Sequence, residues 1–203
     1  MVLYGRNFMK PMQFSLLASI AAVYAIFIYN PSESQREVVS APVAVEYQTA
    51  KTWRCPSCSP EEKYVLKQLQ EKTKISDRNA LATIMGNIKQ ESRFISNICE
   101  GGARVPYDRC YRGGYGIIQW TSENRYRGLG LFAEKYGCDP SEIKCQTRYM
   151  INEPVFQKNL PRFEGAGQSV SQYMIPSYYW LGWGIKGKRQ VYAYQYVNKL
   201  IFS

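Results

Sequence analysis

The chain has 203 residues, enough for one ordinary domain with a hydrophobic core and an additional segment. It contains no histidine, which excludes Cys-His and Ser-His-Asp catalysis and the zinc amidases and endopeptidases that rest on histidine ligands. The formal net charge of +10 suits an anionic partner such as nucleic acid, an acidic wall polymer or phospholipid head groups. The basic residues are scattered along the chain. The positive net charge is therefore explained equally well by general surface charge and by a binding patch.

The N-terminal region has the pattern of a secretory signal or a single membrane anchor. Residues 13–29 ("QFSLLASIAAVYAIFIY") carry no charge and follow Arg6 and Lys10 without an acid. The run is short for a span, which needs roughly 20 apolar residues. We expect residues 1–30 to form an apolar helix that stays as an anchor, is cleaved as a signal peptide, or is buried in an assembly. The first two interpretations imply export, so we expect no nucleic-acid partner.

The six cysteines occur as close sequential pairs: Cys55 and Cys58, Cys99 and Cys110, Cys138 and Cys145. An exported chain keeps such pairs oxidised, and proximity favours bonding between neighbours. The alternative for the "CPSC" pair is a zinc site, but no second such pair follows. We therefore expect three short disulfide loops, no metal and no cofactor.

The remaining segments predict a mainly α-helical fold. Residues 31–60 contain four prolines among small and polar residues and are predicted to be a tether. Helices are predicted over 60–73, from a cap at 76–77 onward, and over 124–137, 140–154 and 187–201. Glycines interrupt the helical pattern over 95–120. Within this range, "YGIIQW" (115–120) is typical of a short strand in a hairpin. The sequence predicts one helical domain over 61–203 with one small β-hairpin.

One carboxylate lies on the apolar side of the second predicted helix. Glu91 follows Ile84 by seven residues, and at about 100° per residue it returns to within about 20° of the same direction. Partial burial and the negative end of the helix dipole both raise the pKa of such a carboxyl. A carboxyl that holds a proton near neutrality suits the general acid of glycoside cleavage. The alternative is a glutamate at a frayed helix end that turns into water.

A glycine-rich segment, "GGYGIIQW" (113–120), follows this carboxylate. Glycine lets the backbone approach a bulky ligand, and Gln119 can both donate to and accept from sugar hydroxyl and acetamido groups. "ESRF" followed by "GYGIIQ" resembles the Glu-Ser … Gly-x-x-Gln signature of soluble lytic transglycosylases and goose-type lysozymes. The longer pattern "IMGNIKQESRF … YGIIQWTSENRYRGLGLFAEKYG … IKCQTRYMINE" is similar to the phage tail lysozyme family over about residues 62–200.

The resemblance implies a lysozyme-like domain that cleaves the β-1,4 bond between N-acetylmuramic acid and N-acetylglucosamine in peptidoglycan. It implies that Glu91 is the catalytic acid and that the Gly-x-x-Gln-Trp segment lines the sugar cleft. Water would complete the reaction of a hydrolase, and the sugar's own 6-hydroxyl that of a lytic transglycosylase; both stay open. The cysteine pairs, an extended loop over 95–112 and the apolar N-terminus lie outside the family pattern.

Other side chains are given smaller roles. The expected substrate-binding residues are Tyr115, Gly116, Gln119, Trp120, Tyr179 and Trp180. Aromatic side chains are more often core, so Trp120 is expected to pack as well, and Trp183 belongs to the same aromatic cluster. Isolated acids are interpreted as solvated surface groups: Glu100, Asp108, Glu123 and Glu153. Gln146 and Arg189 are interpreted as buttresses at helix junctions.

The functional hypothesis is a phage-encoded muramidase, carried in the virion for entry or exported as an endolysin for exit. Its expected location is the virion or the host periplasm and cell envelope. Its expected partners are bacterial peptidoglycan, a membrane through residues 13–29, and phage tail or other virion proteins. A host lytic transglycosylase would share this chemistry. The alternative from another class is a non-catalytic virion structural or wall-binding protein that keeps the fold.

Overall fold

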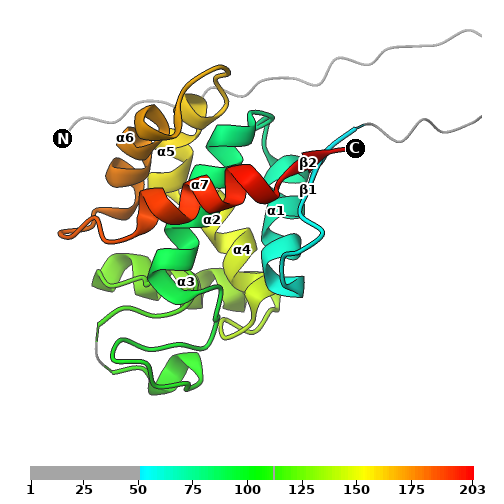
Figure 1. The fold of residues 1–203 in the computed structure, drawn as a ribbon. Helices are drawn as coiled ribbons and strands as arrows, with labels where there is room; N and C mark the ends of the chain where they lie inside the picture. The colour runs from blue at the N-terminus through cyan, green and yellow to red at the C-terminus, as the bar shows by residue number, and fades with distance from the viewer. Residues whose placement is uncertain (1–50, 112) are drawn as a thin grey trace, which may run out of the picture. The chain divides into compact units, whose positions relative to one another are not determined.

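The computed structural model describes residues 51–111 and 113–203 (Figure 1). These residues form seven α-helices and one two-stranded sheet, which confirms the mainly helical fold. The helices are α1 (Pro60–Lys72), α2 (Arg78–Ser92), α3 (Glu123–Tyr136), α4 (Ile143–Asn152), α5 (Pro154–Phe163), α6 (Val170–Leu181) and α7 (Arg189–Lys199), with a 3₁₀ turn η1 (Tyr107–Arg109). The strands are β1 (Trp53–Arg54) and β2 (Ile201–Phe202).

The predictions for residues 1–50, an apolar helix and most of a tether, lie outside the described residues. Across the two described ranges, none of the helices combines the length and the hydropathy that a bilayer crossing needs.

Helix α2 is the central element of the core. Asp77 caps its first turn by accepting from the amides of Asn79 and Ala80, and residues 80–88 are all buried. Helix α7 lies directly across it (Figure 1). Gly86 permits this approach, because a Cβ there would lie 2.4 Å from the backbone nitrogen of Ala193. The close crossing brings the start of α7 to the last turn of α2.

The sequence pattern does not predict α5 and α6. Each contains an internal proline, Pro161 or Pro176, which has no amide hydrogen to donate within the helix. Both helices bury large aromatic rings that contact one another in stacked and edge-on pairs: Phe156, Phe163, Tyr173 and Trp180. Burial of these rings favours the helical arrangement despite the prolines.

The small β element differs in position from the prediction. Residues 115–120 form a tight turn, closed by reciprocal backbone hydrogen bonds between Tyr115 and Trp120, and not a strand of a hairpin. The two-stranded sheet instead joins β1 to β2 in antiparallel register, with Trp53 opposite Phe202. Since the two strands are far apart in the chain, no local turn motif predicts their pairing.

Each neighbouring pair of cysteines forms a disulfide: Cys55–Cys58, Cys99–Cys110 and Cys138–Cys145. The pairing predicted from proximity is confirmed. The zinc interpretation of the "CPSC" segment is wrong, because both of its sulfurs are consumed in the bond. Cys55 and Cys58 are also buried beside β1, so this part of the chain belongs to the folded body.

Candidate functional site

One side chain joins the end of α2 to the 115–120 turn. The hydroxyl of Ser92 donates to the carbonyl of Ile117 (2.8 Å) and accepts from the amide of Phe94 (3.1 Å). The chain reverses here because the two residues after Ser92 take the left-handed conformation, with φ of 53° and 65°. The reversal brings Glu91 and Gln119 to the same cleft.

This cleft has a volume of about 530 Å³. Its walls come from the end of α2, the 115–120 turn, the start of α3, and the loop that leads from α6 into α7. The polar and aromatic lining includes Glu91, Gln119, Thr121, Arg125, Trp183 and Arg189. The ionisable groups in the wall are thus one carboxyl and two guanidinium groups.

The Glu91 carboxyl is largely withdrawn from water, with its side chain 16% exposed. Its Oε1 accepts a hydrogen bond from Nη2 of Arg189 within an ion pair. Burial raises the pKa of Glu91 above its ordinary value, although the charge and hydrogen bond of Arg189 and the charge of Arg125 act in the opposite direction. The interpretation of a frayed helix end that turns into water is therefore wrong.

Arg189 has a larger role than a buttress. Its side chain is only 6% exposed, and Nη1 donates to the carbonyls of Ile185 (3.0 Å) and Lys186 (2.9 Å). Its guanidinium carbon lies 4.7 Å from the centre of the Trp183 ring. One side chain thus holds the α6–α7 loop and pairs with the partly buried carboxyl of Glu91. No sequence signal marks this pair, because its members are 98 residues apart.

The 115–120 turn is shaped by backbone requirements. Gly116 has φ of 72°, and a Cβ there would lie 2.4 Å from Oε1 of Gln146. That oxygen accepts from the amide of Ile117 (2.9 Å), so Gln146 supports this turn, whereas the sequence suggested a buttress at a helix junction. Gln119 lies in the cleft wall, and its Nε2 donates to the Gly116 carbonyl (2.9 Å). Gly116 therefore shapes the turn, and Ile118 and Gln119 are the residues of the turn that line the cleft.

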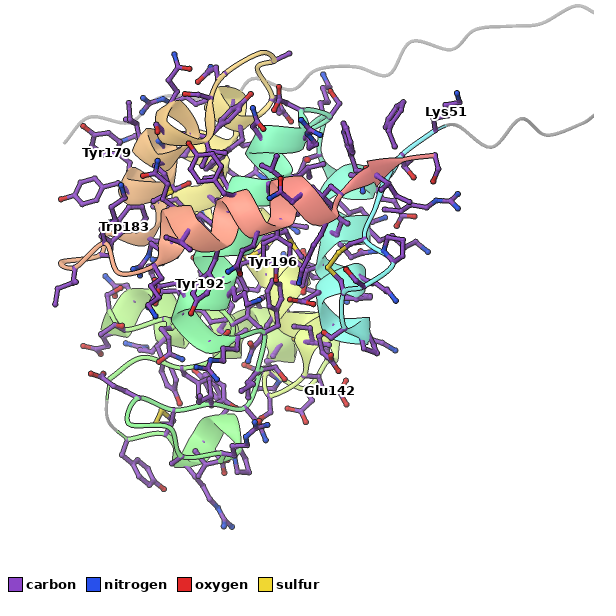
Figure 2. All side chains as sticks on the ribbon, viewed as in Figure 1. Lys51, Glu142, Tyr179, Trp183, Tyr192 and Tyr196 are labelled. Atoms are coloured by element: carbon purple, nitrogen blue, oxygen red, sulfur yellow. A yellow bond between two sulfur atoms is a disulfide. The ribbon has the colours of Figure 1, made fainter. Side chains whose placement is uncertain are left out.

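The division of the aromatic residues between the core and the cleft differs from the prediction. Tyr115, Trp120 and Trp180 are at most 1% exposed, so their rings belong to the core and do not present a face to a sugar. Tyr179 is 61% exposed but is not among the residues that line the cleft. Trp183 is the aromatic side chain in the cleft wall. Figure 2 shows Tyr179 and Trp183 at the α6 end of the molecule.

Glu153 is not the solvated surface acid that the sequence suggests. It is 1% exposed and lies at the junction of α4 and α5. Both indole nitrogens of Trp120 (3.2 Å) and Trp180 (3.1 Å) donate to it, and Arg125 forms a two-bond fork with it through Nε (3.1 Å) and Nη2 (2.6 Å). The other three acids named above, Glu100, Asp108 and Glu123, are exposed as predicted.

The comparisons with known proteins give one result. The family model described as phage tail lysozyme matches residues 61–200. No curated protein and no solved structure matches the chain. In the described part of the chain, no group of three acidic or cysteine side chains gathers that could hold a metal ion. The family match supports a lysozyme-like role on peptidoglycan. Since it covers more than half of the sequence, from α1 through α7, the chain belongs to the phage tail lysozyme family.

Proposed function

We propose that the protein cleaves the β-1,4 bond between N-acetylmuramic acid and N-acetylglucosamine in peptidoglycan, with Glu91 as the general acid. The observation that carries this proposal is a largely buried carboxyl, 16% exposed, with a raised pKa in the wall of a cleft of about 530 Å³. A raised pKa lets a carboxyl keep its proton to a higher pH, and in that form it can protonate the leaving oxygen of a glycosidic bond. The family match supports the choice of substrate.

In the proposed reaction, the bond between the anomeric carbon and the bridging oxygen breaks, and its electron pair stays on the oxygen. Glu91 gives its proton to that oxygen and becomes a carboxylate. Water or the 6-hydroxyl of the same sugar then attacks the anomeric carbon and returns a proton to Glu91. The first route gives a reducing end, and the second gives a 1,6-anhydro end.

The other cleft residues are proposed to hold the glycan. Gln119 offers the oxygen of its side-chain amide as an acceptor to acetamido and hydroxyl groups, since its Nε2 already donates to the carbonyls of Gly116 and Ile98. Trp183 offers part of its ring surface, since one region of the indole is already covered by Arg189. A sugar packed against this wall would exclude water from Glu91, which further disfavours the carboxylate form and keeps the proton in position.

The experiment that tests the proposal is mass spectrometry of purified sacculi digested by the full chain. Muropeptides with reducing ends indicate a hydrolase, and those with anhydro ends indicate a lytic transglycosylase. Release of neither product would refute the proposed activity. We propose that such an enzyme acts from the virion or, after export, in the cell envelope of the host.

One observation favours a second candidate function. The ion pair between Glu91 and Arg189 stabilises the ionised carboxylate, which cannot act as an acid. A protein in which this pair never opens would be a non-catalytic virion structural or wall-binding protein that keeps the fold. The sacculus digestion separates the two candidates, because only the enzyme releases muropeptides.

The Arg189→Gln variant tests how the arginine affects the acid. The cation of Arg189 lowers the pKa of Glu91, so its removal lets the carboxyl keep its proton to a higher pH. The alkaline limb of kcat/KM against pH is therefore expected to move to higher pH in this variant. The main opposing charge left in the cleft is that of Arg125 on α3.

Arg189→Lys is the control for this measurement, since it keeps a cation beside Glu91 while losing the planar guanidinium. Its alkaline limb should stay nearer to that of the unmodified protein. A limb that does not move in Arg189→Gln, or that moves to lower pH, would show that the titrating group is not Glu91.

A further inference from the structure

We propose that Arg125 binds a carboxylate of the substrate strand and thereby makes the cleft selective for anionic glycans over neutral ones. This inference rests on the proposed function. It assigns to Arg125, in the wall of the cleft, the carboxylates of peptidoglycan, which lie on the lactyl groups or on the peptides attached to them. Neutral β-1,4 glycans carry no such group.

The first observation is the way in which Arg125 is held. Its Nε and Nη2 both donate to Glu153, whose two oxygens also accept from Trp120 and Trp180. With four donors on a buried carboxylate, the guanidinium has one fixed orientation at little remaining entropic cost. A further bond connects the Arg125 backbone carbonyl to the hydroxyl of Tyr149 (2.9 Å).

The second observation concerns the edge of the guanidinium that does not face Glu153. The side chain of Arg125 is 23% exposed and lines the cleft with Glu91. Within residues 51–111 and 113–203, no hydrogen bond uses its Nη1. A guanidinium whose one edge is anchored by a buried carboxylate presents its other edge to solvent, and a carboxylate or phosphate is the partner that such an edge prefers.

The third observation is the charge of the cleft wall. The ionisable groups of the lining are Glu91, Arg125 and Arg189, so there are two cations and one carboxyl. When Glu91 carries the proton that the proposed reaction needs, both cations remain. An anionic substrate group near Arg125 would then be attracted by the two cations and repelled by no carboxylate of the cleft wall.

The test compares two substrates that share one glycan. Sacculi are used as isolated, or after their carboxylates have been converted to methylamides with a carbodiimide and methylamine. The full chain is expected to cleave native sacculi with a kcat/KM about 10-fold above that for neutralised sacculi, with most of the change in KM. Arg125→Gln should lose about 10-fold on native sacculi and little on neutralised ones.

Arg127→Gln is the matched control, because it removes one positive charge from the same helix at a side chain that is 67% exposed. It should keep the preference for native sacculi. Equal losses in Arg125→Gln and Arg127→Gln would overturn the proposal, since they would reflect net charge alone. Loss by Arg125→Gln of the same factor on both substrates would overturn it as well.

A second variant and a binding assay distinguish failure of this inference from misfolding and from failure of the proposed function. Where Arg125→Gln does not fold, because Glu153 is left without its cation, the double variant Arg125→Gln/Glu153→Gln removes both charges of the pair and is read in the same way. Co-sedimentation of a Glu91→Gln protein with the two kinds of sacculi measures the preference without catalysis. A binding preference that depends on Arg125 supports the inference even where no product is released.

Discussion

The Glu91→Gln variant is expected to lose about 100- to 10,000-fold in kcat on sacculi, the range that a positioned general acid contributes. The amide cannot give a proton to the leaving oxygen. It keeps an acceptor oxygen for Arg189, so the pair of helices α2 and α7 should stay together. Binding to sacculi should change little, which places the effect in kcat rather than in KM.

The control for this measurement is Glu123→Gln, which neutralises an acid whose side chain is 81% exposed. This variant should retain full activity. Retention of full activity in Glu91→Gln would remove the catalytic assignment and leave the wall-binding alternative. The rate is measured from soluble muropeptides released over time at fixed pH.

The Glu153→Ala variant is expected to lower the free energy of unfolding by about 3–5 kcal/mol, the usual cost of removing one partner of a buried ion pair. Arg125 would lose its partner, and the indole nitrogens of Trp120 and Trp180 would lose their acceptor. Urea denaturation followed by circular dichroism measures the difference. Since typical domains are stable by only 5–15 kcal/mol, the loss is a large share of the total.

Glu134→Ala is the control for stability, because Glu134 is exposed on α3. It should change the free energy of unfolding by no more than about 0.5 kcal/mol. If Glu153→Ala were as stable as this control, the carboxylate would not hold the two tryptophans and the arginine together, and the preorganisation of Arg125 would lose its basis.

The candidate acid could be predicted from sequence because its evidence is local. Glu91 continues an apolar stripe that includes Ile84, and the residues after it end the helix, so both burial and position follow from helical periodicity. The disulfides were predictable for a similar reason, since each joins near neighbours in the chain.

The partners of the site could not be predicted in the same way. Arg189 meets Glu91 across 98 residues, and Arg125 meets Glu153 across 28. Each contact depends on how helices that are separate in the chain pack against one another, and no local pattern encodes that packing. Glu153 in particular follows a helix and precedes a proline, which is the usual setting of a surface acid.

Helices α5 and α6 could not be predicted for a related reason. A proline disfavours a helix locally, whereas the gain from burying Phe163 and Trp180 depends on the rest of the fold. Tertiary burial outweighed the local preference, and the loop and helix that follow carry Trp183 and Arg189 into the cleft.

Gly86 links the packing of the core to the ion pair between Glu91 and Arg189. The separation between the backbones of α2 and α7 is set at a residue with no side chain, one turn and a half before Glu91. A methyl group added there would push α7 away from α2 and weaken the ion pair between Arg189 and Glu91. The pKa of Glu91, which Arg189 lowers, is therefore tied to the thickness of a helix contact in the interior, where solvent does not reach.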